Sequence, residues 1–101
     1  MNKARSKIKA IIKRPDEKIG HVTWISNTLE NLQKHVDGYI EDVRFGDMII
    51  LCDEEGRLKN KPYNCQIGRT SFVGTIVAVG SDGEEFADVP MDITGWKFLL
   101  K

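Results

Sequence analysis

The amino-acid sequence predicts one α+β domain, with a mostly antiparallel or mixed sheet of five to six strands. One helix at about residues 27–37 covers a face of the sheet, and a short helix ends the chain. Three observations support this prediction. The length of 101 residues suits a single domain with one core. Two segments, residues 7–13 and 39–44, have the period of two that is typical of a half-buried strand. One segment has the apolar spacing of a helix instead.

Two strands are predicted at the start of the chain, after a basic N-terminal tail (residues 1–6) that we expect to be flexible. Residues 7–13 alternate apolar and charged side chains at first, which indicates a half-buried strand. Pro15 follows this strand and limits it, because proline has no N–H to donate to a strand ladder. Residues 19–25 are rich in β-branched and aromatic side chains, which favour a second strand.

The predicted helix has recognisable signals at both ends. Asn27 and Glu30 have the spacing of a capping box, and Ser26 and Thr28 are alternative caps. Gly38 stands where a left-handed residue commonly ends a helix. The apolar stripe that would pack on the sheet consists of Leu29, Leu32 and Val36.

A hairpin is predicted after the helix. Residues 39–44 alternate again, and Gly46 with Asp47 favours a tight turn into the apolar residues 48–52. Because that second strand is apolar throughout, we expect it to be central and covered on both faces. A polar turn follows, in which Gly56 is expected to supply a positive φ.

The remaining third of the chain is predicted to add two strands and the C-terminal helix. Residues 57–71 have no clear period and are predicted to be irregular, whereas residues 72–79 form the strongest strand pattern of the protein. A turn at residues 81–83 leads into a strand at residues 84–89. The helix after Pro90 is expected to dock through Ile93, Trp96, Phe98 and Leu100.

Charge and composition limit the classes of partner. The 15 basic and 15 acidic residues cancel, so nucleic acid is not expected as the main partner. Residues 1–14 are nevertheless basic and residues 37–55 are mostly acidic, which would let the two segments pair within one molecule or between neighbours. No apolar run is long enough to span a membrane, and we expect a cytoplasmic protein. Cys52 and Cys65 are then expected to be reduced thiols, with a disulfide as the alternative.

Neither a catalytic set nor a metal-binding spacing is present in the sequence. His21 and His35 lie in no recognised ligand pattern, and packing is the favoured role for Cys52, with a cysteine–histidine pair as the alternative. The acidic residues 53–55 do not have the spacing of a calcium loop, so a solvated turn is favoured over a cation site. We therefore expect no cofactor, no metal and no enzymatic activity.

The irregular segment is the best candidate for ligand binding on the residues alone, because binding residues concentrate on loops. Its tyrosine and amide side chains, together with two cationic ones, could stack on and hydrogen-bond a base or a ribose. An ordinary connecting loop is the alternative. The residues concerned are Lys61, Tyr63, Asn64 and Arg69.

Five short segments carry a family resemblance. They are residues 32–43 (Leu-Gln-Lys-His-Val-Asp-Gly-Tyr-Ile-Glu-Asp-Val), 53–58 (Asp-Glu-Glu-Gly-Arg-Leu), 62–64 (Pro-Tyr-Asn), 72–76 (Phe-Val-Gly-Thr-Ile) and 83–86 (Gly-Glu-Glu-Phe). In order and spacing they resemble a family of small domains of unknown function found in Firmicutes and in their phages and plasmids, whose pattern is Leu-Gln-x-x-Val-Gly-Gly-Tyr-Ile-Glu, Asn-Glu-Glu-Gly-Lys-Leu and Pro-x-Asn. The resemblance covers residues 8 to about 89. This chain departs from the pattern at Asp37, where the family has glycine, and at Asp53, where it has asparagine.

The resemblance implies a topology and a genomic setting, because the family has no established reaction. We expect a non-catalytic accessory protein of a phage or mobile element that binds a small ligand or a host factor. A sharper version is a homo-oligomeric anti-defence protein that sequesters a nucleotide-derived immune signal. The alternatives are a protein–protein inhibitor acting through an acidic face, residues 41–55, and a weak nucleic-acid binder acting through the basic N-terminus.

The residues expected to bind come from both lines of reasoning. Residues matched to the family pattern are Gly38, Tyr39, Glu41, Glu54, Glu55, Gly56, Asn64 and Gly74. The candidate ligand-binding residues are Tyr39, Glu41, Glu54, Glu55, Lys61, Tyr63, Asn64 and Arg69.

Overall fold

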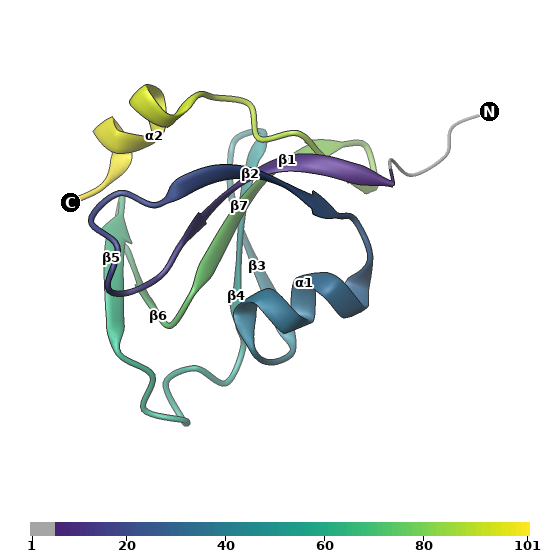
Figure 1. Ribbon diagram of the computed structural model, residues 1–101. Helices are drawn as coiled ribbons and strands as arrows, with labels where there is room; N and C mark the ends of the chain where they lie inside the picture. The colour runs from purple at the N-terminus through teal and green to yellow at the C-terminus, as the bar shows by residue number, and fades with distance from the viewer. Residues whose placement is uncertain (1–5) are drawn as a thin grey trace.

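The computed structural model describes residues 6–101 (Figure 1). The first five residues of the tail predicted at residues 1–6 lie outside this part. The described chain contains eight strands and two helices. In chain order they are β1 (Lys7–Lys13), β2 (His21–Ser26), α1 (Leu29–Val36), β3 (Ile40–Phe45), β4 (Met48–Asp53), β5 (Tyr63–Ile67), β6 (Thr70–Val73), β7 (Ile76–Asp82), β8 (Glu85–Ala87) and α2 (Ile93–Leu99).

Six of these strands form one sheet, and the other two form a hairpin beside it. The sheet has the order β2-β1-β7-β4-β3, and β8 pairs with β7 off this path. Strands β5 and β6 pair with each other in a second, two-stranded sheet. All of these strand pairs are antiparallel. The predicted α+β class is confirmed, with its antiparallel sheet, internal helix and short C-terminal helix.

Different elements cover the two faces of the main sheet. Leu32 and Val36 of α1 pack on one face and share a core cluster with the strand residues beneath them. Phe72 of β6 and Trp96 of α2 belong to a second cluster on the other face. Figure 1 accordingly shows α1 and the β5–β6 hairpin on opposite sides of the sheet. Burying each such side chain stabilises the fold by about 1.5–3 kcal/mol.

Strand β4 lies at the centre of this arrangement. It is buried along its whole length and lies between β3 and β7. Met48 and Ile50 enter the cluster beneath the hairpin, while Ile49 and Leu51 enter the cluster beneath α1. The prediction of a central strand covered on both faces is confirmed. The tight turn before it is confirmed as well, with Gly46 at φ 64°.

The residues that cap α1 differ from Asn27 and Gly38, which the sequence favours. Thr28, one of the alternative caps, is the N-cap, and its Oγ1 accepts a hydrogen bond from the Asn31 N–H at 3.1 Å. The left-handed residue after the helix is Asp37 (φ 58°, ψ 54°), so the assignment of that role to Gly38 is wrong by one residue. Asp tolerates this region better than most residues with a side chain. Leu29 is 64% exposed and does not join the predicted stripe.

The segment predicted to be irregular contains β5 and the start of β6, which form a hairpin. Within residues 57–71, Gly68 (φ 59°) forms the turn that lets β6 fold back on β5. The continuous strand predicted at residues 72–79 is also wrong, because Gly74 (φ 72°) turns the chain between β6 and β7. The last predicted strand is shorter than expected and covers only β8.

The positive φ expected at Gly56 occurs elsewhere in the turn. Asn60 has φ 57°, whereas Gly56 keeps an ordinary backbone conformation. Gly56 instead lies against β6, because a Cβ there would be 3.0 Å from Cγ2 of Val73. The glycine therefore allows the turn to pack closely on the hairpin, and a side chain there would press on Val73.

Helix α2 docks through a single large side chain. Trp96 is fully buried, and its Nε1 donates a hydrogen bond to the Ile19 carbonyl at 2.8 Å. Ile93 and Leu100 pack against the same cluster. Phe98, which was also predicted to dock, is 84% exposed. Positions two apart on a helix point in nearly opposite directions, so Trp96 and Phe98 cannot both face the sheet. Neither helix in residues 6–101 is long and apolar enough to cross a membrane.

Candidate binding cleft

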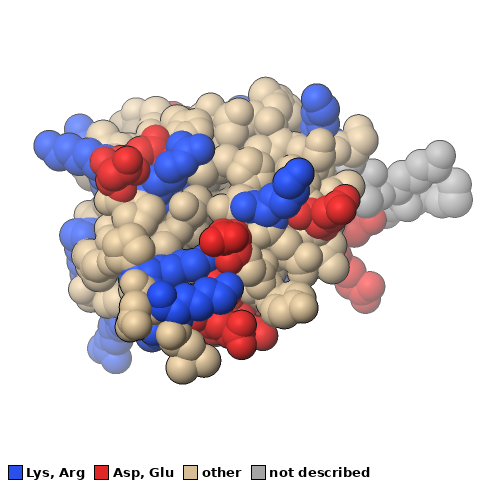
Figure 2. Space-filling model, turned by 60° about the horizontal axis from the view of Figure 1, so that its bottom comes forward, with Lys and Arg blue, Asp and Glu red and all other residues tan. Residues whose placement is uncertain are grey.

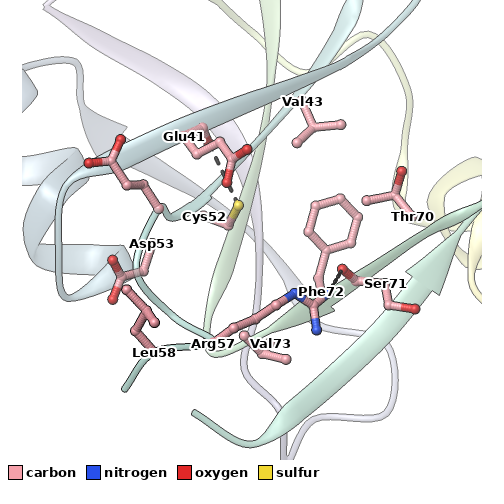
Figure 3. Close-up of a pocket in the computed structure, with 11 residues that line it drawn as sticks. Glu41, Val43, Cys52, Asp53, Arg57, Leu58, Thr70, Ser71, Phe72 and Val73 are labelled. Atoms are coloured by element: carbon pink, nitrogen blue, oxygen red, sulfur yellow. Dashed lines mark hydrogen bonds between the residues drawn. The ribbon is translucent and has the colours of Figure 1, made fainter. Parts of the chain in front are cut away.

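A cleft of about 220 Å³ opens between the edge of the main sheet and the β5–β6 hairpin, and Figure 3 shows it in close-up. We call it the β3–β6 cleft. Its walls come from β3, β4, the turn after β4, and β6. Because β3 is an edge strand and β6 belongs to a separate sheet, no backbone ladder joins these two strands in the described chain.

The inner wall of the β3–β6 cleft is apolar. It is formed by Val43, Cys52 and Phe72, and the Phe72 ring contacts that of Phe45 edge-on, with the ring centroids 6.5 Å apart. Burial, together with the negative charge of Glu41, raises the pKa of the Cys52 thiol to about 11. The thiol is therefore protonated at neutral pH, and its Sγ donates weakly to the Glu41 carbonyl at 3.7 Å. This wall can accept an apolar group or the aliphatic part of a longer side chain.

The rim of the cleft is polar and partly unsatisfied. Glu41, Glu54 and Arg57 are all exposed, and Figure 3 shows Glu41 and Arg57 on opposite sides of the opening. Arg57 uses Nη2 to donate to the Ser71 carbonyl at 2.7 Å, which fixes the guanidinium against β6. Within residues 6–101, no salt bridge involves the carboxylate of Glu41 or Glu54. The rim thus offers two acceptor groups that form no salt bridge with residues 6–101.

A second group of charged residues lies directly beside the cleft. We call Asp53, Lys59 and Lys61 the Asp53 cluster. The Asp53 side chain is 1% exposed, and its Oδ2 accepts hydrogen bonds from Lys59 Nζ and Lys61 Nζ, each at 2.8 Å. Its Oδ1 accepts a third from the Glu55 N–H at 2.9 Å. Burial opposes ionisation of this carboxyl, but the three hydrogen bonds outweigh it and lower the pKa of Asp53 to about 2.

The Asp53 cluster also holds the end of α1. Lys61 Nζ donates to the carbonyls of Val36 at 2.8 Å and Asp37 at 2.9 Å. Gly38 lies so close to the carboxylate that a Cβ there would be 2.3 Å from Asp53 Oδ1. Helix α1, the turn after β4 and the start of β3 therefore meet around one buried carboxylate.

Asn64, another predicted ligand-binding residue, is hydrogen-bonded to other parts of the chain. Its side chain is buried, and Nδ2 donates to the carbonyls of Lys13 at 2.8 Å and Gly74 at 2.7 Å. Its Oδ1 accepts from Lys13 Nζ at 2.8 Å. This amide joins β1, β5 and the turn after β6, and three of its hydrogen-bonding positions are occupied.

The eight predicted ligand-binding residues fall into four places. Glu41 and Glu54 lie on the rim of the β3–β6 cleft. Tyr39 and Glu55 line a shallow hollow beside α1. Lys61 and Asn64 bond inside the protein, as described above. Tyr63 and Arg69 are exposed near opposite ends of the hairpin, so the predicted group of Lys61, Tyr63, Asn64 and Arg69 does not form one surface.

The cleft contains residues that sequence reasoning did not select, chiefly Arg57 and Phe72. Arg57 was visible as the fifth residue of the Asp-Glu-Glu-Gly-Arg-Leu segment, which already carried the family resemblance. Phe72 looked like an ordinary strand residue, and only the fold of the missed hairpin places it opposite Val43. A basic side chain directly after an acidic turn is the signal that could have drawn attention to this site.

Of the two histidines and two cysteines, only Cys52 lines the β3–β6 cleft. His21 Nδ1 lies 2.8 Å from Glu17 Oε2, and burial lowers the pKa of His35. Both cysteines are buried and free. In the part of the chain that the structure describes, no three His, Cys, Asp or Glu side chains gather as metal ligands would.

Comparison with protein-family models decides the family. A model of a domain of unknown function, DUF3846, matches residues 8–99, which is nearly the whole chain. The chain belongs to the DUF3846 family. The predicted membership in a family of domains of unknown function is thereby confirmed. Among curated proteins and solved structures, none matches this DUF3846 domain.

The two residues after α1 meet different structural requirements. Asp37 has a left-handed backbone. The next residue, Gly38, has no room for a side chain beside Asp53. Position 37 therefore requires a left-handed backbone, which Asp tolerates, whereas position 38 requires the absence of a side chain.

Proposed function

We propose that this DUF3846 domain is a non-catalytic binding protein, and that the β3–β6 cleft receives one basic side chain of a partner protein. The observation that carries the proposal is an apolar-walled cleft whose rim carboxylates, Glu41 and Glu54, have no ion pair among residues 6–101. A lysine or arginine can lay its aliphatic stem along such a wall and place its charge at the rim.

The size of the cleft supports a side chain over a whole small molecule. Sites for drug-sized ligands or cofactors measure roughly 300–1,000 Å³. At about 220 Å³ the β3–β6 cleft is smaller than this range. One anchoring side chain fits a space of this size, and the rest of a partner would then spread over the surrounding surface.

The charge around the cleft supports a basic partner. Arg44 is the one exposed cation of residues 40–55, and the exposed acids there are Glu41, Asp42, Asp47, Glu54 and Glu55. Arg57 is held against β6 by its bond to the Ser71 carbonyl. On the face drawn in Figure 2, acidic and basic side chains are interleaved and do not form a broad basic patch for a polyanion. A phosphate-bearing ligand would meet the Glu41 and Glu54 carboxylates, which repel it.

The genomic setting and the kind of partner are part of the same proposal. If the domain is encoded by a phage or mobile element, as its resemblance implies, the partner is a host protein, and binding of its basic side chain inhibits or redirects it. A nucleotide-derived immune signal is the competing ligand, and the experiment below includes it.

The test is an NMR titration of the ¹⁵N-labelled protein with a defined probe, the acetylated and amidated tripeptide Gly-Arg-Gly. We expect amide shifts concentrated at Glu41, Val43 and residues 70–73, and none with the matched Gly-Glu-Gly peptide. The double substitution Glu41→Gln with Glu54→Gln should abolish the shifts. The substitution Glu84→Gln, which removes an exposed carboxylate from the β7–β8 turn, should leave them unchanged.

Other outcomes would reject the proposal. If the arginine peptide gives shifts elsewhere, or equal shifts in the Glu41→Gln/Glu54→Gln protein, the cleft does not bind basic side chains. Calorimetry with a panel of cyclic nucleotides and ADP-ribose derivatives supplies the competing arm. Saturable heat with any of them would show that the protein binds a nucleotide, and the nucleotide proposal would then replace the basic-side-chain proposal.

A further inference from the structure

The two edge strands of the main sheet, β2 and β3, differ in the side chains that they carry. Edge strand β3 carries Glu41, Asp42 and Arg44 as exposed charges, and such charges discourage pairing with another strand. Edge strand β2 contains no Lys, Arg, Asp, Glu or Pro. Among residues 6–101, β1 is the one strand that pairs with it, so no described strand lies along its outer side. One edge is therefore protected against strand addition and the other is not.

Strand β2 also exposes large apolar side chains. Trp24 is 59% exposed and Val22 is 41% exposed. They lie two positions apart, so both point to the same face of the sheet. Their partners across the ladder are Lys9 and Ile11 of β1, and Ile11 belongs to the cluster beneath the hairpin and α2. A tryptophan and a valine at a bare sheet edge are what a strand-pairing interface needs and what a solvated edge avoids.

We infer that β2 pairs with β2 of a second copy of this chain, antiparallel and centred on Thr23, to form one continuous sheet across a homodimer. In this register Val22 of each copy lies opposite Trp24 of the other, which gives two favourable aromatic–β-branched pairs. Thr23 lies opposite Thr23 on the other face. A strand paired with itself in this way makes the isologous contact of a two-fold dimer.

Two features favour a second copy over another partner. The formal charge of the chain is zero, so two copies do not repel each other at long range. The strand offers no charge of its own that would select a charged partner, since His21 already interacts with Glu17. The inference is independent of the β3–β6 cleft, which lies at the opposite edge of the sheet.

Sedimentation equilibrium from low micromolar to millimolar concentration tests the dimer. The weight-average mass should rise from the 11.5 kDa of one chain toward twice that value. Trp24→Lys should keep the protein monomeric over the whole range, with an unchanged circular dichroism spectrum and unfolding midpoint. Phe98→Lys is the matched control, because Phe98 on α2 is an aromatic residue that is even more exposed than Trp24, and this variant should dimerise like the wild type.

Cysteine cross-linking tests the register. With copper phenanthroline and oxygen as the oxidant, two Thr23→Cys chains should lose their thiol protons and form one intermolecular disulfide in high yield. Ser26→Cys, at the end of the same strand, should not cross-link, because it has no symmetric neighbour in this register. A monomeric wild type, a Trp24→Lys variant that still dimerises, or equal cross-linking of the two cysteine variants would overturn the inference.

Discussion

The Asp53 cluster and the β3–β6 cleft lie side by side on the same turn, but they use their polar side chains in opposite ways. In the cluster, the Asp53 carboxylate accepts three hydrogen bonds and is almost fully buried. In the cleft, Glu41 and Glu54 are exposed and have no salt bridge within the described residues. Sequence alone makes these acids look alike, since Asp53 and Glu54 are neighbours in one acidic run.

This difference separates residues that hold the fold from residues available for binding. A buried charge that loses its partner costs several kcal/mol, so the members of the Asp53 cluster are constrained by stability. An exposed carboxylate contributes little to stability and can be kept or changed according to what it binds. Mutations in the two regions should therefore separate stability from binding.

The largest effect is expected for Asp53→Asn. This substitution removes the carboxylate and leaves Lys61, whose side chain is 14% exposed, without its closest anion. Breaking such a pair typically costs about 3–5 kcal/mol. The free energy of unfolding should fall by this amount in a urea titration. The neighbouring Glu54→Gln should change it by less than about 0.5 kcal/mol. Equal losses in the two variants would show that Asp53 is no more structural than the cleft residues.

Acid should remove part of the same stabilisation. The pKa of Asp53 is lowered from 3.8 to about 2 in the folded protein, so the unfolded chain binds a proton first as the pH falls. The contribution of this ionisation is complete above about pH 5 and is lost progressively as the pH falls toward 2. Allowing for screening by solvent, the loss is about 1–2 kcal/mol.

The measurement is the difference in unfolding free energy between the wild type and Asp53→Asn at several pH values. It should be constant from pH 7 to about pH 5 and shrink between pH 4 and 2. Glu17, whose pKa is also lowered because its hydrogen bonds from Arg14 and His21 outweigh burial, titrates in both proteins and cancels. A difference that stays constant down to pH 2 would mean that Asp53 gains nothing from being ionised.

A smaller loss is expected for Gly38→Ala. The added Cβ would overlap the Asp53 carboxylate at 2.3 Å, and shifting that carboxylate should cost about 1–3 kcal/mol. Gly95→Ala is the matched control, because its Cβ would meet Met91 and Asp92 at ordinary distances of 3.4 and 3.6 Å. That variant should gain up to about 1 kcal/mol from helix propensity. Thermal unfolding of both proteins makes the comparison, and a Gly38→Ala protein as stable as the wild type would show that the carboxylate is not tightly held.

The case of Gly38 illustrates how far the sequence predicts this molecule. Alternation and helical spacing correctly predict the α+β class, and the unbroken apolar run at residues 48–52 correctly predicts the buried β4, because both are local signals. These patterns do not show that the Asp53 carboxylate, fifteen positions later, leaves no room for a side chain at Gly38. They also do not show that the left-handed residue after α1 is Asp37. They also miss the β5–β6 hairpin, whose short strands have too few residues to establish a period.

The candidate site was predicted less well than the fold, for a related reason. A sequence shows which side chains are polar but not whether another part of the chain already binds them. Lys61 and Asn64 looked available in a loop, yet their partners are Asp53 and Val36 in one case and Lys13 and Gly74 in the other. The acids Glu41 and Glu54, in contrast, were correctly expected to be surface residues.

The smallest effect on stability, and the sharpest test of the difference between the two regions, is expected in the cleft. Glu41→Gln and Arg57→Gln each change one charge at the exposed rim, so each should alter the free energy of unfolding by less than about 0.5 kcal/mol. Their effects on the Gly-Arg-Gly peptide should have opposite signs. Glu41→Gln removes the attracting charge and should weaken binding, whereas Arg57→Gln removes a like charge and should strengthen it. Dissociation constants from the NMR titration show whether each substitution weakens or strengthens binding. If the two substitutions shift the constant in the same direction, the cleft does not select its ligand by charge.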